Sequence, residues 1–116
     1  MKHIHIVNPY GSTAMQRMIN PLLEELPKLY EVTTSQDVDH TADLNIHAPW
    51  HTLIGMEKQG NSKHIAMYTH CNPPDVSNLH DACNRADLVV CMSYAGRNEL
   101  LDLGVDPKKL WVIYSA

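Results

Sequence analysis

One segment combines residue types that could do chemistry. In THCNPPD, residues 69–75, an apolar run ends on His70 and Cys71 and then meets Pro73 and Pro74. Such a pair suits a metal site, a cysteine nucleophile with its base, or one polar group that a strand delivers to a ligand. Neighbours on an extended chain point to opposite sides, which disfavours a dyad of His70 and Cys71. The spacing favours delivery of His70 by a strand tip.

A second segment, HAPWH, carries two histidines four residues apart. On a helix, this spacing would let His47 and His51 bind zinc together. Pro49 lies between them, and the residue before a proline is pushed toward extended geometry. We therefore expect no regular helix through both histidines and no metal site here.

The composition indicates one globular domain. The chain has 116 residues, of which 44% are hydrophobic and 19% charged, and its net charge is -4. A chain of this length buries roughly two-thirds of its unfolded surface. With a negative net charge, the sequence has no basic stripe that could bind phosphates, so no nucleic-acid partner is expected.

Three cysteines without C-x-x-C spacing argue against a disulfide framework and favour a reducing, cytoplasmic setting. No run approaches the ~20 apolar residues of a membrane span, which leaves peripheral membrane contact open.

Predicted strands and helices alternate along the chain. Short apolar, β-branched runs predict six strands, at residues 2–7, 30–34, 43–48, 64–69, 87–93 and 110–115. Helical periodicity occupies residues 15–26, 75–86 and 94–104. We expect Pro21 to kink or restart the first helix, with Asn20 as a new cap, and Gly104 to stop the last. The alternation predicts a Rossmann-like three-layer α/β/α domain with a parallel sheet of about six strands over residues 1–116.

Ligands bind such sheets in the crevice outside the carboxyl ends of the strands. Three segments are expected to meet there: residues 8–13, 69–75 and 93–97. In the first, Gly11 with Ser12 and Thr13 would present backbone N–H groups to a phosphate, or else form a plain turn with an N-cap. Neither a G-x-G-x-x-G nor a P-loop pattern is present, which argues against a nicotinamide enzyme and a P-loop protein.

The segment ADLVVCMSYAGRNELLDLGVDPKKLWVIYSA, residues 86–116, resembles the end of the N-terminal domain in group 1 glycosyltransferases of the GT-B fold. That family has an alanine and aspartate before a hydrophobic strand, then a serine, an arginine and leucine on a helix, and a glycine-valine turn. The matching residues are Ala86, Asp87, Ser93, Arg97, Leu100, Gly104, Val105, Lys109, Val112 and Ile113. NPYGST, LNIHAPW and MYTH resemble earlier pieces of the same domain, whereas Ser115 departs from the family's usual asparagine. The resemblance covers nearly all of the chain and is firmest from Thr69 onward.

The resemblance implies one half of a two-domain enzyme. In the family, a C-terminal domain holds most of the nucleotide sugar donor, and the N-terminal domain shapes the acceptor side. The implied reaction, with retention in the group 1 pattern, moves a hexosyl unit from a nucleotide diphosphate sugar to a glycan, lipid or small acceptor. A C-terminal donor domain is the expected partner; without its paired glutamates, the 116-residue chain is expected to be inactive and to self-associate. No cofactor or metal is expected.

The resemblance and the strand-end rule together nominate site residues. His70 is the catalytic candidate, as a contact to the donor sugar or its leaving group. The binding candidates are Gly11, Ser12, Thr13, His47, Trp50, Ser93 and Arg97. Trp50 could equally pack against the sheet. Ser93 is expected to be a helix cap rather than a ligand, and Arg97 is expected to be exposed to solvent. The rival function is a stand-alone Rossmann-like binding or interaction module without catalytic activity.

Overall fold

The computed structural model describes residues 2–8, 13–69 and 76–113. Its six strands form one parallel sheet in the order β2-β1-β3-β4-β5-β6. The strands are β1 (His3–Val7), β2 (Glu31–Ser35), β3 (Leu44–His47), β4 (Lys63–Tyr68), β5 (Leu88–Cys91) and β6 (Leu110–Val112). The α-helices are α1 (Thr13–Glu25), α2 (Val76–Arg85) and α3 (Tyr94–Asp102), with 3-10 turns η1 (Leu26–Lys28), η2 (Trp50–Leu53) and η3 (Pro107–Lys109). The predicted Rossmann-like α/β class is confirmed.

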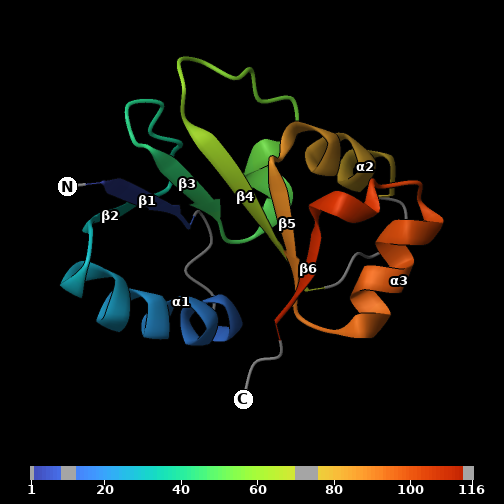
Figure 1. Ribbon diagram of the computed structural model, residues 1–116, viewed down its shortest axis with the longest axis horizontal. Coiled ribbons are helices and arrows are strands. Elements are labelled where there is room, and N and C mark those ends of the chain that lie inside the picture. Colours follow the sequence, from blue (N-terminus) through green and yellow to red (C-terminus); the bar gives the residue numbers. More distant parts are fainter. Residues whose placement is uncertain (1, 9–12, 70–75, 114–116) are drawn as a thin grey trace.

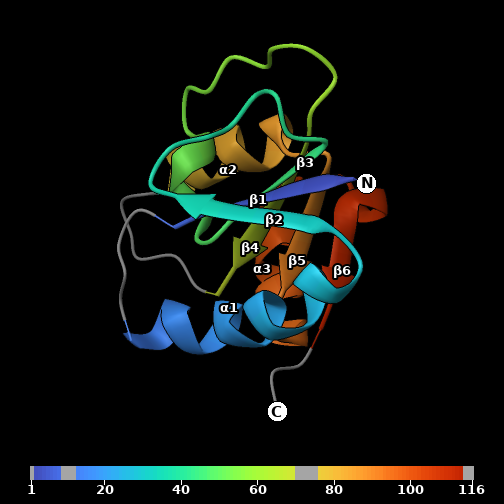
Figure 2. The ribbon, with the colours of Figure 1, turned by 90° about the vertical axis from the view of Figure 1, so that its left-hand side faces the viewer.

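Helices cover both faces of the sheet. Figure 1 shows α1 by itself on one side and α2 and α3 together on the other, and Figure 2 shows α1 and α2 on opposite sides of the strands. Strand residues alternate between the two layers, as their period of two requires. Ile19 of α1 packs with Ile4, Ile6, Ile46, Ala48 and Met67. Leu79 of α2 and Leu100 of α3 pack with Ala66, Tyr68, Val89, Cys91 and Leu110.

The predicted restart of the first helix at Pro21 is wrong. Helix α1 runs from Thr13 through Pro21 to Glu25. Asn20 is not a cap; its side-chain oxygen instead accepts a hydrogen bond of 2.6 Å from Gln16. Pro21 removes one backbone donor, but the apolar face of the helix continues beyond it, with Leu22 and Leu23 packed on the core. That packing offsets the cost of one missing hydrogen bond.

The last helix ends as predicted. Leu103 is the C-cap of α3, and Gly104 follows with a φ of +88°, a conformation that residues with a Cβ rarely adopt. Within the part of the chain that the structure describes, no helix has the length and hydrophobicity to cross a membrane.

The strand order places a topological switch point between β1 and β3. The chain goes from β1 to β2 on one side and then returns to β3 on the other. The two strands end together, since the Ala48 N–H donates to the Val7 carbonyl at 2.9 Å. Crevices at such points are where open α/β sheets bind ligands. Strand β1 ends before Asn8 and strand β3 ends before Ala48, at this same edge of the sheet.

Candidate functional site

The carboxyl edge of the sheet carries the candidates that the structure describes. Thr13 is the first residue of α1, His47 is the last of β3, and Ser93 and Arg97 lie beyond the end of β5. Gly11, Ser12 and His70 lie outside the described residues. The predictions for these three, and the substrate contacts of the others, remain predictions.

Ser93 is the N-cap of α3. Its backbone is extended, and its Oγ accepts a hydrogen bond of 3.0 Å from the Gly96 N–H. This satisfies one of the backbone donors that every helix leaves unpaired at its start. A Cβ on Gly96 would lie 3.3 Å from the Tyr68 ring, so the first turn of α3 lies close against β4. The cap interpretation of Ser93 is therefore correct, and Ser93 fixes where α3 begins.

Arg97 lies in the first turn of α3 and is half-buried. Its guanidinium makes no ion pair or hydrogen bond with another residue in the described part of the chain. Burial raises the pKa of the Cys91 thiol, and the Arg97 charge acts in the opposite direction, so Arg97 lies near the end of β5. The Arg97 charge thus lies near the carboxyl edge without an ion-pair partner among the residues that the structure describes. Cys91 itself is buried and stays a neutral thiol.

His47 turns into the protein. It is fully buried, with Nδ1 2.6 Å from the Thr52 hydroxyl and Nε2 2.9 Å from Nδ1 of His64. Burial, reinforced by the neighbouring histidines, lowers the pKa of His47 to about 3. The ring is therefore neutral at physiological pH and joins β3 to β4. Its predicted contact with an acceptor has no counterpart in these bonds and stays a prediction.

Trp50 belongs to the core. It is 1% exposed in η2, packs with the cluster beneath α2 and α3, and stacks on His51 at a ring-centroid distance of 3.8 Å. Of the two alternatives, packing and stacking on a sugar, the structure shows packing. His47 and His51 belong to no group of three potential metal ligands among the described residues.

A cavity between α2 and α3 was not predicted. It has a volume of about 250 Å³ and is lined by Tyr68, Val76, Leu79, Glu99, Asp102 and Leu103. The Tyr68 hydroxyl donates to a carboxylate oxygen of Glu99. Small-molecule sites usually measure about 300–1,000 Å³, so this cavity is slightly smaller than such sites. No local sequence signal could have found it, because it depends on how two helices pack.

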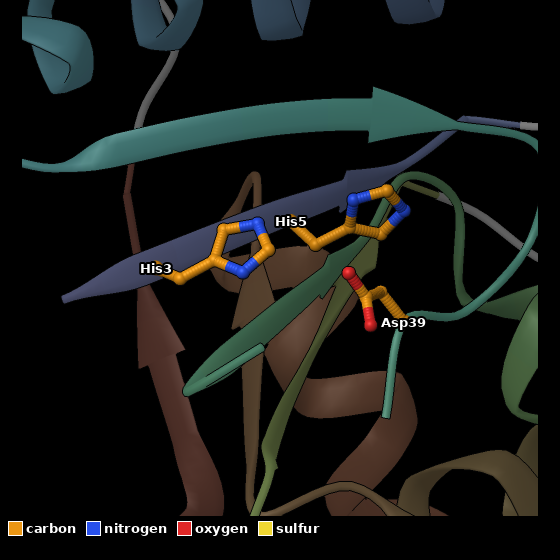
Figure 3. A group of neighbouring side chains, drawn as sticks. All are labelled: His3, His5 and Asp39. Atoms are coloured by element: carbon orange, nitrogen blue, oxygen red, sulfur yellow. The ribbon is translucent and has the colours of Figure 1, made fainter. Parts of the chain in front are cut away.

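The sequence also did not predict a polar cluster beside β1. His3 and His5 of β1 lie beside Asp39, which belongs to the connection between β2 and β3 (Figure 3). The signal was present in the sequence, because H-x-H on a strand places both rings on one face. The third residue could not be found that way, since Asp39 meets them only through the fold.

No protein-family model matches the chain, and no curated protein matches it in sequence. A function for this chain must therefore be argued from its fold, from the geometry of these residues and from the resemblance over residues 86–116.

Proposed function

We propose that this domain is the acceptor-side N-terminal domain of a GT-B glycosyltransferase. The reaction moves a hexosyl unit from a nucleotide diphosphate sugar to a glycan, lipid or small acceptor. Support comes from the resemblance over residues 86–116 and from a parallel sheet with a switch point between β1 and β3. The observation that carries the proposal is the half-buried Arg97, whose charge has no partner among the described residues.

Glycosyl transfer makes two demands on such an edge. The transition state has oxocarbenium character, and negative charge builds on the leaving phosphate. Arg97 supplies a cation for that charge or for an anionic acceptor, and Ser93 positions it by fixing the start of α3. In this proposal His70, which follows β4, contacts the donor sugar or its leaving group. The cavity beside Tyr68 and Glu99 receives a sugar ring of the acceptor, whose hydroxyls donate to the Glu99 carboxylate.

Ligand titration by NMR tests the binding half of this proposal. UDP-glucose and GDP-mannose are added separately to the isotopically labelled 116-residue chain. We expect weak binding that shifts the amide signals of Ser93, Gly96 and Arg97. Arg97→Gln should weaken the binding about tenfold, since a hydrogen bond to a charged group contributes about 1.5–3 kcal/mol. Arg17→Gln, which removes an exposed charge from α1, is the matched control. Signals that do not move, or equal losses in both variants, would contradict the assignment.

A second function has one observation in its favour. Trp111 and Ile113, at the edge strand β6, are 59% and 55% exposed. Leu110 and Val112 pack on the core with α3, so Trp111 and Ile113 face the opposite side, where α1 packs over β1 and β3. An apolar surface at a sheet edge suits a protein contact. A stand-alone Rossmann-like interaction module would use this surface and would show no response to nucleotide sugars.

A further inference from the structure

The histidines of β1 meet the connection that follows β2. His3 and His5 are two residues apart on one face of the strand, and residues 36–43 return across that face to β3. One ligand atom each of His3, His5 and Asp39 lies within 4.8 Å of the other two. Figure 3 shows both rings on the same side of β1, with the Asp39 carboxylate beside them. Three groups that bind transition metals thus converge from two separate parts of the chain.

Asp39 is held in place through its backbone and through one of its two carboxylate oxygens. The side chain of Asn45, which is fully buried, accepts from the Asp39 N–H at 3.0 Å and donates to the Asp39 carbonyl at 2.9 Å. Asn45 also donates to the Ser62 hydroxyl at 2.7 Å. The Thr41 hydroxyl and N–H both donate to Oδ1 of Asp39, and these bonds lower the pKa of the carboxyl. Both bonds use Oδ1, and no described residue donates a hydrogen bond to Oδ2, so this oxygen remains for a ligand.

His5 is oriented in the way that metal-binding histidines usually are. Its Nε2 lies 2.9 Å from the Asp37 carbonyl, which can only accept, so this nitrogen carries the hydrogen when the bond forms. The lone pair then lies on Nδ1, and a second-shell carbonyl of this kind commonly fixes the tautomer of a ligating histidine. The Thr33 hydroxyl lies 2.7 Å from His5 Nδ1 and 2.7 Å from His3 Nε2. With that tautomer the Thr33 hydroxyl donates to His5 Nδ1 and accepts from His3 Nε2, and an ion that binds His5 Nδ1 would take the place of this hydrogen bond.

We propose that His3, His5 and Asp39 bind a divalent transition-metal ion, for which Zn²⁺ is the best fit. Two imidazoles and one carboxylate, with water in the fourth position, form a usual zinc ligand set. Ligand atoms of a tetrahedral zinc site lie roughly 3.5 Å apart, so the side chains must draw together by about 1 Å. The ligands occupy the first and third positions of β1, toward its amino end. The ion would tie residues 36–43 to the sheet, and this proposal is independent of the glycosyltransferase assignment.

Isothermal titration with ZnCl₂ tests the site. The protein should carry no histidine tag, and a Gly-Ser extension before Met1 prevents chelation by a free N-terminal amine together with His3. We expect one Zn²⁺ per chain with a micromolar or lower Kd. Asp39→Asn should weaken binding at least about tenfold, since it removes a ligand while its neutral amide keeps the same shape. His80→Asn, on α2, should leave binding unchanged.

A second measurement separates lost binding from lost folding. Far-UV circular dichroism should give the same spectrum for Asp39→Asn, His80→Asn and the unaltered chain. Co²⁺ in place of Zn²⁺ should show the visible absorption of a four-coordinate site, and Asp39→Asn should lose it. No Zn²⁺ binding, equal binding by Asp39→Asn, or an equal loss in His80→Asn would overturn the proposal.

Discussion

Lowering the pH from 7 to 5 should destabilise the domain through the buried histidine His47. In the folded protein, the ring is fully buried between Thr52 and His64, and its pKa is lowered from 6.5 to about 3. Protonation would place a positive charge on a ring that is cut off from water. The charged ring would also lie beside a second imidazole, with 2.9 Å between Nε2 of His47 and Nδ1 of His64. The unfolded chain imposes neither cost, so protons bind preferentially to the unfolded state.

The size of the effect is set by this difference in pKa. The contribution of His47 to stability is complete above pH 6.5 and is lost as the pH falls through the window from 6.5 to about 3. Each pH unit inside that window costs about 1.4 kcal/mol, so pH 5 removes about 2 kcal/mol. Burial also lowers the pKa of His64, which adds loss in the same direction. The lowered pKa values of Asp39, Asp81 and Asp87 matter mainly below about pH 5, where the carboxyls of the unfolded chain begin to bind protons.

Urea unfolding at the two pH values measures this loss. His47→Gln keeps a side chain that can hydrogen-bond but does not titrate, so its loss between pH 7 and pH 5 should be smaller by about 2 kcal/mol. His80→Gln replaces a histidine on α2 and should behave like the unaltered chain. Equal free energies of unfolding at pH 7 and pH 5 in the unaltered chain would refute the reasoning. So would a His47→Gln variant that loses as much as the unaltered chain.

Three further changes test other parts of the structure. Gly104→Ala should lower the free energy of unfolding by about 1–2 kcal/mol, because φ at this position is +88°; an unchanged urea midpoint would contradict this. Asn45→Ala should lower the free energy of unfolding by about 2–3 kcal/mol and speed hydrogen exchange in residues 36–43, because a buried amide with three hydrogen bonds is lost. Unchanged exchange would show that Asn45 does not hold the connection between β2 and β3. Trp111→Ser should reduce self-association in sedimentation runs while changing stability by less than about 0.5 kcal/mol, and a chain that is monomeric before the substitution would refute this prediction.

The order of strands and helices could be predicted because its signals are local. Apolar runs predicted where the six strands lie along the chain, although not their order in the sheet. Ser93 caps the start of α3 and Gly104 follows its end, as the sequence predicted. The prediction at Pro21 was wrong because a local cost is outweighed by packing that no local pattern reveals. The edge of the sheet where ligands bind is a property of the fold class alone.

The state of individual side chains could not be predicted in this way. His47, Asn45 and His64 occupy alternate strand positions whose polarity suggests an open face, yet each is fully buried. Partners from outside the strands, such as Thr52 for His47 and the backbone of Asp39 for Asn45, satisfy two of them. The cluster of His3, His5 and Asp39 and the cavity between α2 and α3 likewise depend on contacts between distant segments.

An assay of glycosyl transfer is the decisive test of the proposed function. The protein expressed from its complete reading frame should be incubated with a panel of nucleotide diphosphate sugars and candidate acceptors, and release of the nucleoside diphosphate followed. We predict turnover with at least one donor, and a loss of at least about 100-fold in His70→Ala, the size expected for a group that assists the leaving group. The circular dichroism of that variant should be unchanged. No release with any donor, or unchanged turnover in His70→Ala, would contradict the proposed function.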